Sequence, residues 1–390
     1  MRRSRPEIRP ASGGLPEAAR ASCLRELEAL CSVPCGTEMV DGVNRVASIL
    51  EERLAGLGLA VRRRPAGGFG DHLVATTGRP GRQIVLGGHM DTTYTDYAAL
   101  PPFHVEGDFA VGPGALDMKG GIVACLAALD RLMATGELEK LPITVLLNSD
   151  EERGSPTARE LYREIIPRTK AALFAEPGGP GGTLVIARRG KISYRLDVRG
   201  AGMHAGEGAG LKRSALLGLA HKVIALEGLN TRFPCTAVNV GRAWGGTASN
   251  TVPGEAVALA DIRYALTDTE PAIRAAVAEI CQAEHVTGVT CTATETSFRP
   301  VWNRPEVSRP LAAMAERLLG ADHPPTVTTP QGGTADSNWF GAAGVPTLDG
   351  LGPSGSGEHT ADERVHLPSL FTRAELLALL IPAIEEEQPE

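Results

Sequence analysis

The sequence carries no excess of positive charge. Its formal net charge at pH 7 is -7, and its pI is about 5.8. A protein whose main partner is nucleic acid or an anionic membrane presents a basic patch or stripe. We therefore expect neither partner, and a small molecule or short peptide is the expected substrate.

Long hydrophobic runs are also missing. No uncharged apolar run approaches the ~18 residues that a membrane helix needs. The first residues, MRRSRPEIRP, are positively charged, but the polar segment PEAARASCLREL follows without the apolar core of a signal peptide. These absences predict a cytoplasmic protein without a membrane partner.

Cysteine is scarce and odd in number. The seven cysteines are scattered along the chain: Cys23, Cys31, Cys35, Cys125, Cys235, Cys281 and Cys291. This pattern predicts reduced, buried thiols rather than a disulfide framework. Cys31 and Cys35 could share a zinc ion, but no second Cys or His pair at zinc-finger spacing accompanies them. We interpret both as structural thiols.

What the chain does have is length and apolar content. With 390 residues and 43% hydrophobic residues, it can bury a large core and form more than one domain. Apolar runs alternate with segments of helical period, which predicts an α/β fold with a mixed, largely parallel sheet flanked by helices. The predicted strands are 84–89, 142–150, 171–177 and 345–352, and the predicted helices are 118–137, 155–166, 306–320 and 367–384.

The middle of the chain has a different pattern. KISYRLDVRG (191–200) alternates strictly, as an antiparallel strand with one wet face does. The following segments give the order βαββαβ, the size of a small α+β domain. We predict a catalytic domain made of 1–187 and 299–390, interrupted by an inserted lid or dimerisation domain, 188–298.

Three adjacent acids, Asp150, Glu151 and Glu152, follow the apolar run ITVLL. Neighbouring carboxylates raise each other's pKa and need compensation. A solvated loop would tolerate them at little cost, whereas a metal ion would neutralise them.

Other candidate ligands follow predicted strands or lie in glycine-rich loops: His89, Asp91, Asp117, Glu176 and His359. The carboxyl edge of an open α/β sheet is where ligands bind, so these groups can converge. Imidazoles and carboxylates without a thiolate suit zinc, cobalt or manganese.

Short sequence motifs in these segments resemble those of a known protein family. GGHMDTT, GALDMKGG, SDEERGS, FAEPG, MHAG and GEHTADE occur in this order between roughly residues 20 and 385. The chain resembles the dinuclear zinc metallopeptidase and amidohydrolase family of glutamate carboxypeptidase, acetylornithine deacetylase, succinyl-diaminopimelate desuccinylase and aminoacylase, and looks closest to the glutamate carboxypeptidase branch.

The resemblance implies a site for two divalent metal ions, zinc first, with cobalt and manganese as alternatives. Asp117 would bridge the ions. His89 and Glu176 would complete one site, and Glu152 and His359 the other. The Asp117–Met118 peptide bond would be cis.

The resemblance also implies the catalytic groups. Glu151 would be the general base that takes a proton from a water bridged between the metals. Asp91 would accept the second ring N–H of His89 and fix its tautomer. His204 would stabilise the oxyanion, in its own or a partner's cleft. Asp150 is interpreted as a structural or capping acid. A homodimer through the inserted domain is expected.

Asn250 and Arg263 match positions that face substrate, and a planar arginine fork suits a carboxylate. Glutamate-specific members carry basic residues near Thr183 and Thr329, so this departure leaves the amino acid open, unless Arg188 or Arg189 compensates. The expected reaction is hydrolysis of an N-acyl amino acid or a C-terminal peptide bond. The alternatives are a biosynthetic deacylase of an acetylated or succinylated diamino acid and a non-catalytic metal-bound binding protein.

Overall fold

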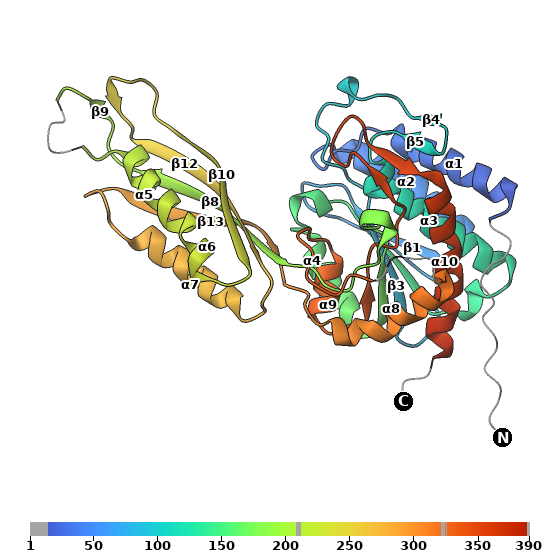
Figure 1. Cartoon of the computed structure of the whole chain (residues 1–390). Helices are drawn as coiled ribbons and strands as arrows, with labels where there is room; N and C mark the ends of the chain where they lie inside the picture. Colours follow the sequence, from blue (N-terminus) through green and yellow to red (C-terminus); the bar gives the residue numbers. More distant parts are fainter. Residues whose placement is uncertain (1–14, 208–211, 321–323, 325, 388–390) are drawn as a thin grey trace. The chain divides into compact units, whose positions relative to one another are not determined.

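The computed structural model describes residues 15–207, 212–320, 324 and 326–387. Its contacts divide the chain into two compact units, drawn in Figure 1. The first unit contains Met1–Ala187, Arg304–Thr329 and Ala335–Glu390, and the second contains Arg188–Asn303 and Pro330–Thr334.

The second unit ends later than the predicted boundary at 298. Its last strand continues to Arg299, and main-chain bonds of 2.8 and 3.0 Å then pair Trp302 with Arg188. The short segment 330–334 joins this unit because the Arg189 N–H donates to the Gln331 carbonyl at 2.9 Å.

A six-stranded sheet organises the first unit. Its order is β1 (Ala60–Arg64), β2 (His72–Thr76), β6 (Ile143–Asn148), β3 (Gln83–His89), β7 (Thr169–Phe174) and β14 (Thr347–Leu348). β6, β3, β7 and β14 run parallel, while β2 is antiparallel to both of its neighbours. The predicted mixed, largely parallel sheet is confirmed. Every residue of β6 is buried, as expected for a strand covered on both faces.

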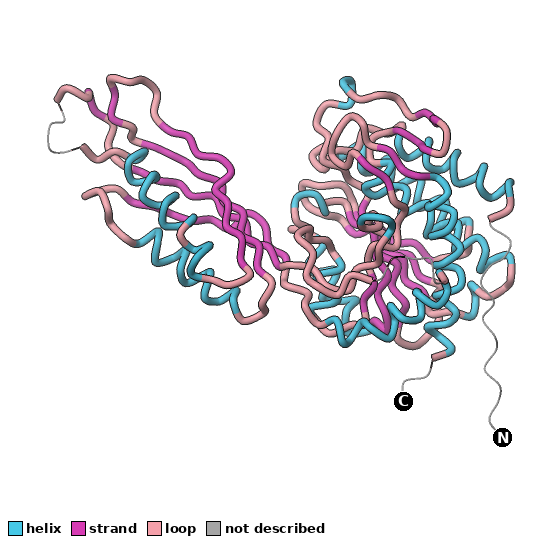
Figure 2. Tube along the Cα trace, viewed as in Figure 1, coloured by secondary structure: helices cyan, strands magenta, loops and turns pink. Residues whose placement is uncertain are grey.

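Helices cover both faces of this sheet, as Figure 2 shows. They are α1 (Glu17–Cys31), α2 (Val40–Gly56), α3 (Gly120–Ala134), α4 (Ala158–Ile165), α8 (Pro305–Leu319), α9 (Ser337–Ala342) and α10 (Leu367–Glu386). On one face, α4 and α9 pack through Tyr162 and Phe340 against Val85 and Leu146. α3 approaches the opposite face, where Leu86 and Val145 point.

Shorter elements connect these layers. The single-turn elements are η1 (Tyr97–Ala99), η2 (Ala115–Lys119), η3 (Leu138–Lys140), η4 (Glu151–Arg153), η5 (Ile166–Arg168) and η6 (Pro180–Gly182). A small sheet has the order β15 (Gly355–Ser356), β16 (Arg364–His366), β5 (Phe109–Val111) and β4 (His104–Glu106). It brings the chain around residue 111 beside the chain around residue 364.

Among the described residues, α10 is long and apolar enough to cross a membrane by length and composition alone. However, 56% of its apolar stretch is buried inside the protein. It packs against α3 and α8. α10 therefore forms part of the core of the first unit.

The second unit is a four-stranded antiparallel sheet of order β10 (Thr236–Gly245), β12 (Glu255–Tyr264), β8 (Gly190–Arg199) and β13 (Thr290–Arg299). Its helices are α5 (Ala215–Glu227), α6 (Leu229–Arg232) and α7 (Thr269–Gln282), and β9 (Met203–His204) pairs with β11 (Thr251–Val252). The predicted βαββαβ order is present. Ile192, Tyr194, Leu196 and Val198 form its buried face, as the alternation predicted.

Two sequence expectations need correction. The predicted strand 345–352 is only Thr347–Leu348, because the chain then leaves the sheet and Asp349 pairs with Val185. The cysteines are all free, as predicted, but not all buried: Cys235 is exposed, and Cys281 and Cys291 are half-buried in the second unit.

Candidate metal centre

Five segments of the first unit bring acids and imidazoles to the carboxyl edge of the sheet. His89 is the last residue of β3, and Glu152 lies in η4, just after β6. Glu176 follows β7, Asp117 lies in η2, and His359 precedes β16. This is the edge at which open α/β sheets bind ligands.

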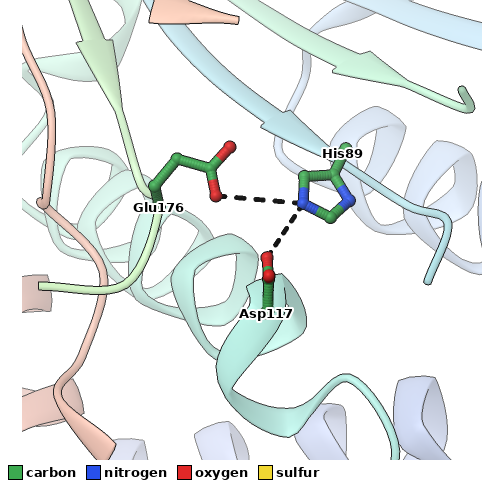
Figure 3. A group of neighbouring side chains, drawn as sticks. All are labelled: His89, Asp117 and Glu176. Atoms are coloured by element: carbon green, nitrogen blue, oxygen red, sulfur yellow. Dashed lines mark hydrogen bonds and ion pairs between the residues drawn. The ribbon is translucent and has the colours of Figure 1, made fainter. Parts of the chain in front are cut away.

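The first group of candidate ligands is His89, Asp117 and Glu176 (Figure 3). The Nε2 atom of His89 lies 3.0 Å from Asp117 Oδ1 and 3.9 Å from Glu176 Oε2. His89 and Glu176 are buried. One ligand atom from each residue therefore faces a common point.

The second group is Asp117, Glu152 and His359. The Nε2 atom of His359 lies 3.1 Å from Asp117 Oδ2 and 3.7 Å from Glu152 Oε2. The two oxygens of Asp117 thus face two different imidazoles. Within each group the ligand atoms lie within 4.8 Å of one another. The structure brings together all five residues that the sequence predicted as ligands, with Asp117 shared.

The electrostatics of the two groups are those of a site built around positive charge. Burial, together with the charge of Asp117, raises the pKa of Glu152 to about 9, and burial raises the pKa of Glu176 well above its usual range. Burial opposes protonation of His89, yet Asp117 and Asp91 raise its pKa. Carboxylates crowded in this way remain ionised only with a cation beside them.

The donor set also fits divalent metal ions chemically. It contains imidazole nitrogen and carboxylate oxygen, and no cysteine occurs in the metal-competent groups of the described residues. Glu152 Oε1 is buried without a hydrogen-bond partner in the described structure. A buried polar atom of this kind is costly unless a ligand satisfies it. The alternative zinc pair Cys31 and Cys35 lies outside these groups and is buried.

Asp91 connects the histidine of β3 to the acidic turn after β6. The main-chain oxygen of Asp91 lies 3.0 Å from His89 Nδ1, nearer than its carboxylate at 3.4 Å. The carboxylate mainly accepts other bonds, from the Thr37 hydroxyl at 2.7 Å and from the N–H groups of Glu151 and Glu152 at 3.2 Å. Asp91 therefore orients both the imidazole and the turn that carries the acids.

The three adjacent acids have different surroundings. Glu152 points to the second group, while Asp150 is buried and its Oδ2 accepts from the Thr157 N–H at 2.7 Å, just before α4. This contact agrees with the interpretation of Asp150 as a structural or capping acid. Glu151 is half-buried, and its charge raises the pKa of both Glu152 and Glu176. The Asp117–Met118 bond is cis, as the resemblance implied.

Sequence reasoning missed one residue of this centre, Glu363. Its buried carboxylate accepts the N–H groups of Gly114, Leu116 and Asp117 at 2.8, 2.8 and 2.9 Å. It also accepts the Tyr94 hydroxyl at 2.5 Å, which lies 2.8 Å from the Thr360 carbonyl. Glu363 therefore fastens the loop of Asp117 to the loop of His359. Glu363 is the last residue of the segment GEHTADE, four residues after His359, and this position was the signal that could have suggested it.

The remaining predicted site residues, His204, Asn250 and Arg263, lie in the second unit. His204 is exposed on β9, and the main-chain oxygen of the exposed Asn250 accepts the Ala205 N–H at 2.8 Å. The Gly206 N–H donates to His204 Nδ1 at 3.2 Å. A neutral imidazole that accepts at Nδ1 carries its proton on Nε2, so a neutral His204 can donate from Nε2.

Arg263 is at the other end of this sheet. The β9–β11 pair, which carries His204, lies near the end of the sheet where Arg199 of β8 pairs with Glu255 of β12. Arg263 pairs with Lys191 at the opposite end. Its Nε donates to Asp261 at 2.6 Å, and Nη1 donates to the Gly332 carbonyl at 3.2 Å. Because β12 is 10 residues long, its ends are ~30 Å apart at a rise of ~3.3 Å per residue. Arg263 and His204 of the same chain are therefore too far apart to contact one small ligand together.

Several known proteins are similar to this chain in sequence or in fold. A model of peptidase family M20/M25/M40 matches residues 85–383. Carboxypeptidase G2 of Pseudomonas sp. is 31% identical over 365 residues, covering 92% of this chain and 88% of that protein. Succinyl-diaminopimelate desuccinylase of Alkalilimnicola ehrlichii is 29% identical over 352 residues, covering 83% of this chain and 89% of that protein.

The crystal structure of an M20 family metallo-carboxypeptidase from Sulfolobus solfataricus matches with a TM-score of 0.76 at 17% identity. The match covers 95% of this chain and 99% of that chain, and at this identity it shows the fold. The resemblance inferred from the motifs is thereby confirmed. The chain belongs to peptidase family M20/M25/M40 and is a metal-dependent hydrolase of amide bonds.

Proposed function

We propose that the chain hydrolyses the amide bond of an N-acyl amino acid or the C-terminal peptide bond of a small peptide, with two divalent ions at the candidate metal centre. The observation that carries this proposal is the shared carboxylate of Asp117, whose oxygens lie 3.0 and 3.1 Å from two imidazoles. His89 and Glu176 would hold one ion, and Glu152 and His359 the other.

Divalent ions bound there supply the Lewis acidity that polarises a scissile carbonyl and makes water nucleophilic near neutral pH. The donor set favours zinc, with cobalt and manganese as alternatives.

Glu151 is the proposed general base. It begins η4, three residues after the end of β6, and its N–H donates to Asp91 at 3.2 Å. It is half-buried, and it belongs to neither of the metal-competent groups among the described residues. It takes a proton from the attacking water and passes it to the leaving nitrogen.

His204 and Asn250 are proposed to act in the cleft of a second copy of the chain. The ~30 Å length of β12, from its 10 residues, separates them from Arg263. His204 would donate Nε2–H to the oxyanion, and Arg263 would bind a carboxylate of the substrate.

The second unit carries features suited to pairing with itself. β10 is an edge strand of the sheet, and α5 exposes Leu217 and Ile224, at 50% and 72%. Unpaired edges and clustered apolar side chains favour association. We propose a homodimer through this unit.

The names of two relatives indicate the class of substrate. Carboxypeptidase G2 is named for carboxypeptidase activity, and the desuccinylase for removal of a succinyl group from diaminopimelate. The second candidate function is therefore deacylation of an acylated diamino acid.

The test is release of free amino acid from a panel of N-acetyl, N-succinyl and N-benzoyl amino acids and dipeptides by the zinc- or cobalt-loaded protein. Glu151→Gln is the matched variant, because it keeps the size of the side chain. We expect wild-type turnover on at least one acyl amino acid, and loss of turnover in Glu151→Gln with unchanged metal content. Turnover retained by Glu151→Gln would remove Glu151 as the base, and a silent wild-type panel with two metals bound would contradict amide hydrolysis of this substrate class.

A further inference from the structure

A pocket of about 440 Å³ opens directly beside Glu152 in the first unit. Its volume is in the range of ligand-binding pockets, ~300–1,000 Å³. Segments 36–39 and 92–95 form its walls, and Glu152 and Arg153 form one side. A substrate whose reacting carbonyl lies at the metal centre can therefore extend one arm into this pocket.

The walls of the pocket are fixed to the metal centre. The Thr37 N–H donates to the Thr92 carbonyl, and the Thr92 N–H to the Cys35 carbonyl, both at 3.1 Å. The Thr37 hydroxyl donates to Asp91 at 2.7 Å, the same carboxylate that accepts the Glu152 N–H. The walls also approach closely: a Cβ on Gly36 would lie 2.1 Å from the Tyr94 carbonyl oxygen, so only glycine fits. The pocket is thus a preformed part of the site.

The lining of the pocket combines polar side chains with the apolar Met39 and Tyr94. Thr37, Thr93 and Thr95 line it, together with Glu38 and Arg153. Arg153 is the only cationic side chain among the lining residues. Glu38 and Glu152 are the acids, and Glu152 already faces His359.

Arg153 makes a limited contact with the protein. Its Nη2 atom pairs with Oε1 of Glu38, and this is the one ion pair of Arg153 among the described residues. The two side chains are 51% and 68% exposed, so the pair itself adds little stability. A guanidinium has five N–H donors in a planar fork. Glu38 can therefore hold Arg153 at the pocket while other donors of the fork stay available to a ligand.

We propose that this pocket binds a carboxylate-bearing arm of the substrate, with Arg153 as the residue that recognises it. This inference rests on the proposed function. The arm is a dicarboxylic acyl group or an acidic amino-acid side chain, since both present the same carboxylate to the fork. A bidentate arginine–carboxylate pair supplies both energy and orientation. Arg153 is thus a specificity-determining residue supplied by the first unit alone.

The experiment compares kcat/KM on N-acetyl-L-alanine, N-succinyl-L-alanine and N-acetyl-L-glutamate. The variants are Arg153→Gln, Arg153→Lys and the control Arg64→Gln. Arg64 suits the control because it forms an ion pair with Glu164 in the same unit, and the two side chains are similarly exposed, at 44% and 56%. Arg153→Lys keeps the charge and loses the planar fork.

We expect Arg153→Gln to lower kcat/KM ~10- to 100-fold more for one dicarboxylate substrate than for N-acetyl-L-alanine, the range for loss of a charged hydrogen bond. Arg153→Lys should lose less, and Arg64→Gln should leave the ratio unchanged. A loss on N-succinyl-L-alanine assigns the arm to the acyl group, and a loss on N-acetyl-L-glutamate assigns it to the amino acid. Equal losses on all three substrates, or no loss, would overturn the proposal.

A binding measurement separates this proposal from amide hydrolysis itself. If the wild-type protein cleaves none of the three compounds, the proposed function fails, but calorimetry with the same compounds still measures the pocket. Tighter binding of a dicarboxylate than of N-acetyl-L-alanine, abolished by Arg153→Gln, supports the role of Arg153. Equal affinities in the wild type and in Arg153→Gln contradict it.

Discussion

The clearest prediction concerns Glu363, which holds the loop of the shared ligand Asp117. Glu363→Gln keeps the size of the side chain and replaces one acceptor oxygen by an amide that only donates. In the wild type, Oε1 accepts from Leu116 and Asp117, while Oε2 accepts from Gly114 and Tyr94. The glutamine oxygen can serve only one of these two pairs. At least one buried main-chain N–H then faces another N–H.

The magnitude follows from these bonds. A buried donor without an acceptor costs ~1–3 kcal/mol, and the remaining bonds lose the extra strength of a charged acceptor, ~1 kcal/mol. We expect the free energy of unfolding to fall by ~2–4 kcal/mol. Because the loop carries Asp117, metal affinity should fall ~10- to 100-fold, as for other groups that orient ligands.

The assay is competition for zinc with a chromophoric chelator, together with the visible absorption spectrum of the cobalt-loaded protein. Asp362→Asn is the matched control, because Asp362 is the exposed neighbour and its removal changes the charge equally. Tyr94→Phe removes one donor to Glu363 and should have a smaller effect in the same direction. If Glu363→Gln binds both metals with wild-type affinity and an unchanged cobalt spectrum, the positioning role is refuted. If Asp362→Asn loses as much metal affinity as Glu363→Gln, the loss of one negative charge explains the effect, and the positioning role is not needed.

Three further predictions concern other parts of the molecule. His204→Ala should lower kcat ~10²–10³-fold if the imidazole donates to the oxyanion, whereas an unchanged kcat in steady-state assays would exclude a catalytic role for His204. Exhaustive chelation should abolish turnover, and added zinc or cobalt should restore it; activity that survives complete metal removal would contradict the metal centre. Burial lowers the pKa of His72 to about 4, so folded His72 stays neutral where unfolded His72, with a pKa of ~6.5, takes up a proton. The stability that depends on neutral His72 is fully present above pH ~6.5 and is lost as the pH falls towards 4. The free energy of unfolding should therefore fall by ~2 kcal/mol between pH 7 and 5. Chemical denaturation of the metal-free protein should show a smaller loss in His72→Gln, and equal losses would exclude His72 as the source.

The sequence predicted those parts of the fold that depend on local pattern. β3 and β6 are apolar runs, so both strands were predicted. The predicted end of β3 at residue 89 is confirmed, whereas β6 ends at Asn148, two residues before its predicted end. The alternation of β8 placed its buried face correctly. By contrast, β14 is only two residues long. The chain leaves the sheet at Asp349 and Gly350, where Gly350 has a φ of 72°, and the prediction did not use this Asp-Gly turn signal.

The same distinction applies to the metal centre. His89, Asp117, Glu152, Glu176 and His359 could be predicted because their motifs occur in a recognisable order. Glu363 could not, because an acid in a polar loop looks like a solvated residue until the loop of Asp117 is placed against it. The main-chain contact of Asp91 with His89 and the distance between His204 and Arg263 likewise depend on tertiary structure. The local turn after β3 decides the first, and the pairing of β8 with β12 decides the second.

The central claim is that Asp117 joins two metal sites in one centre. The most direct test is the metal content of the purified, zinc-reconstituted protein, measured by elemental analysis alongside Asp117→Asn, with turnover followed as zinc is titrated into the metal-free wild type. The account predicts about two zinc ions per chain in the wild type, with turnover rising until both sites are filled, and weakened binding at both sites in Asp117→Asn. A wild-type chain that reaches full turnover with one ion, or an Asp117→Asn variant that keeps two tightly bound ions, would contradict it.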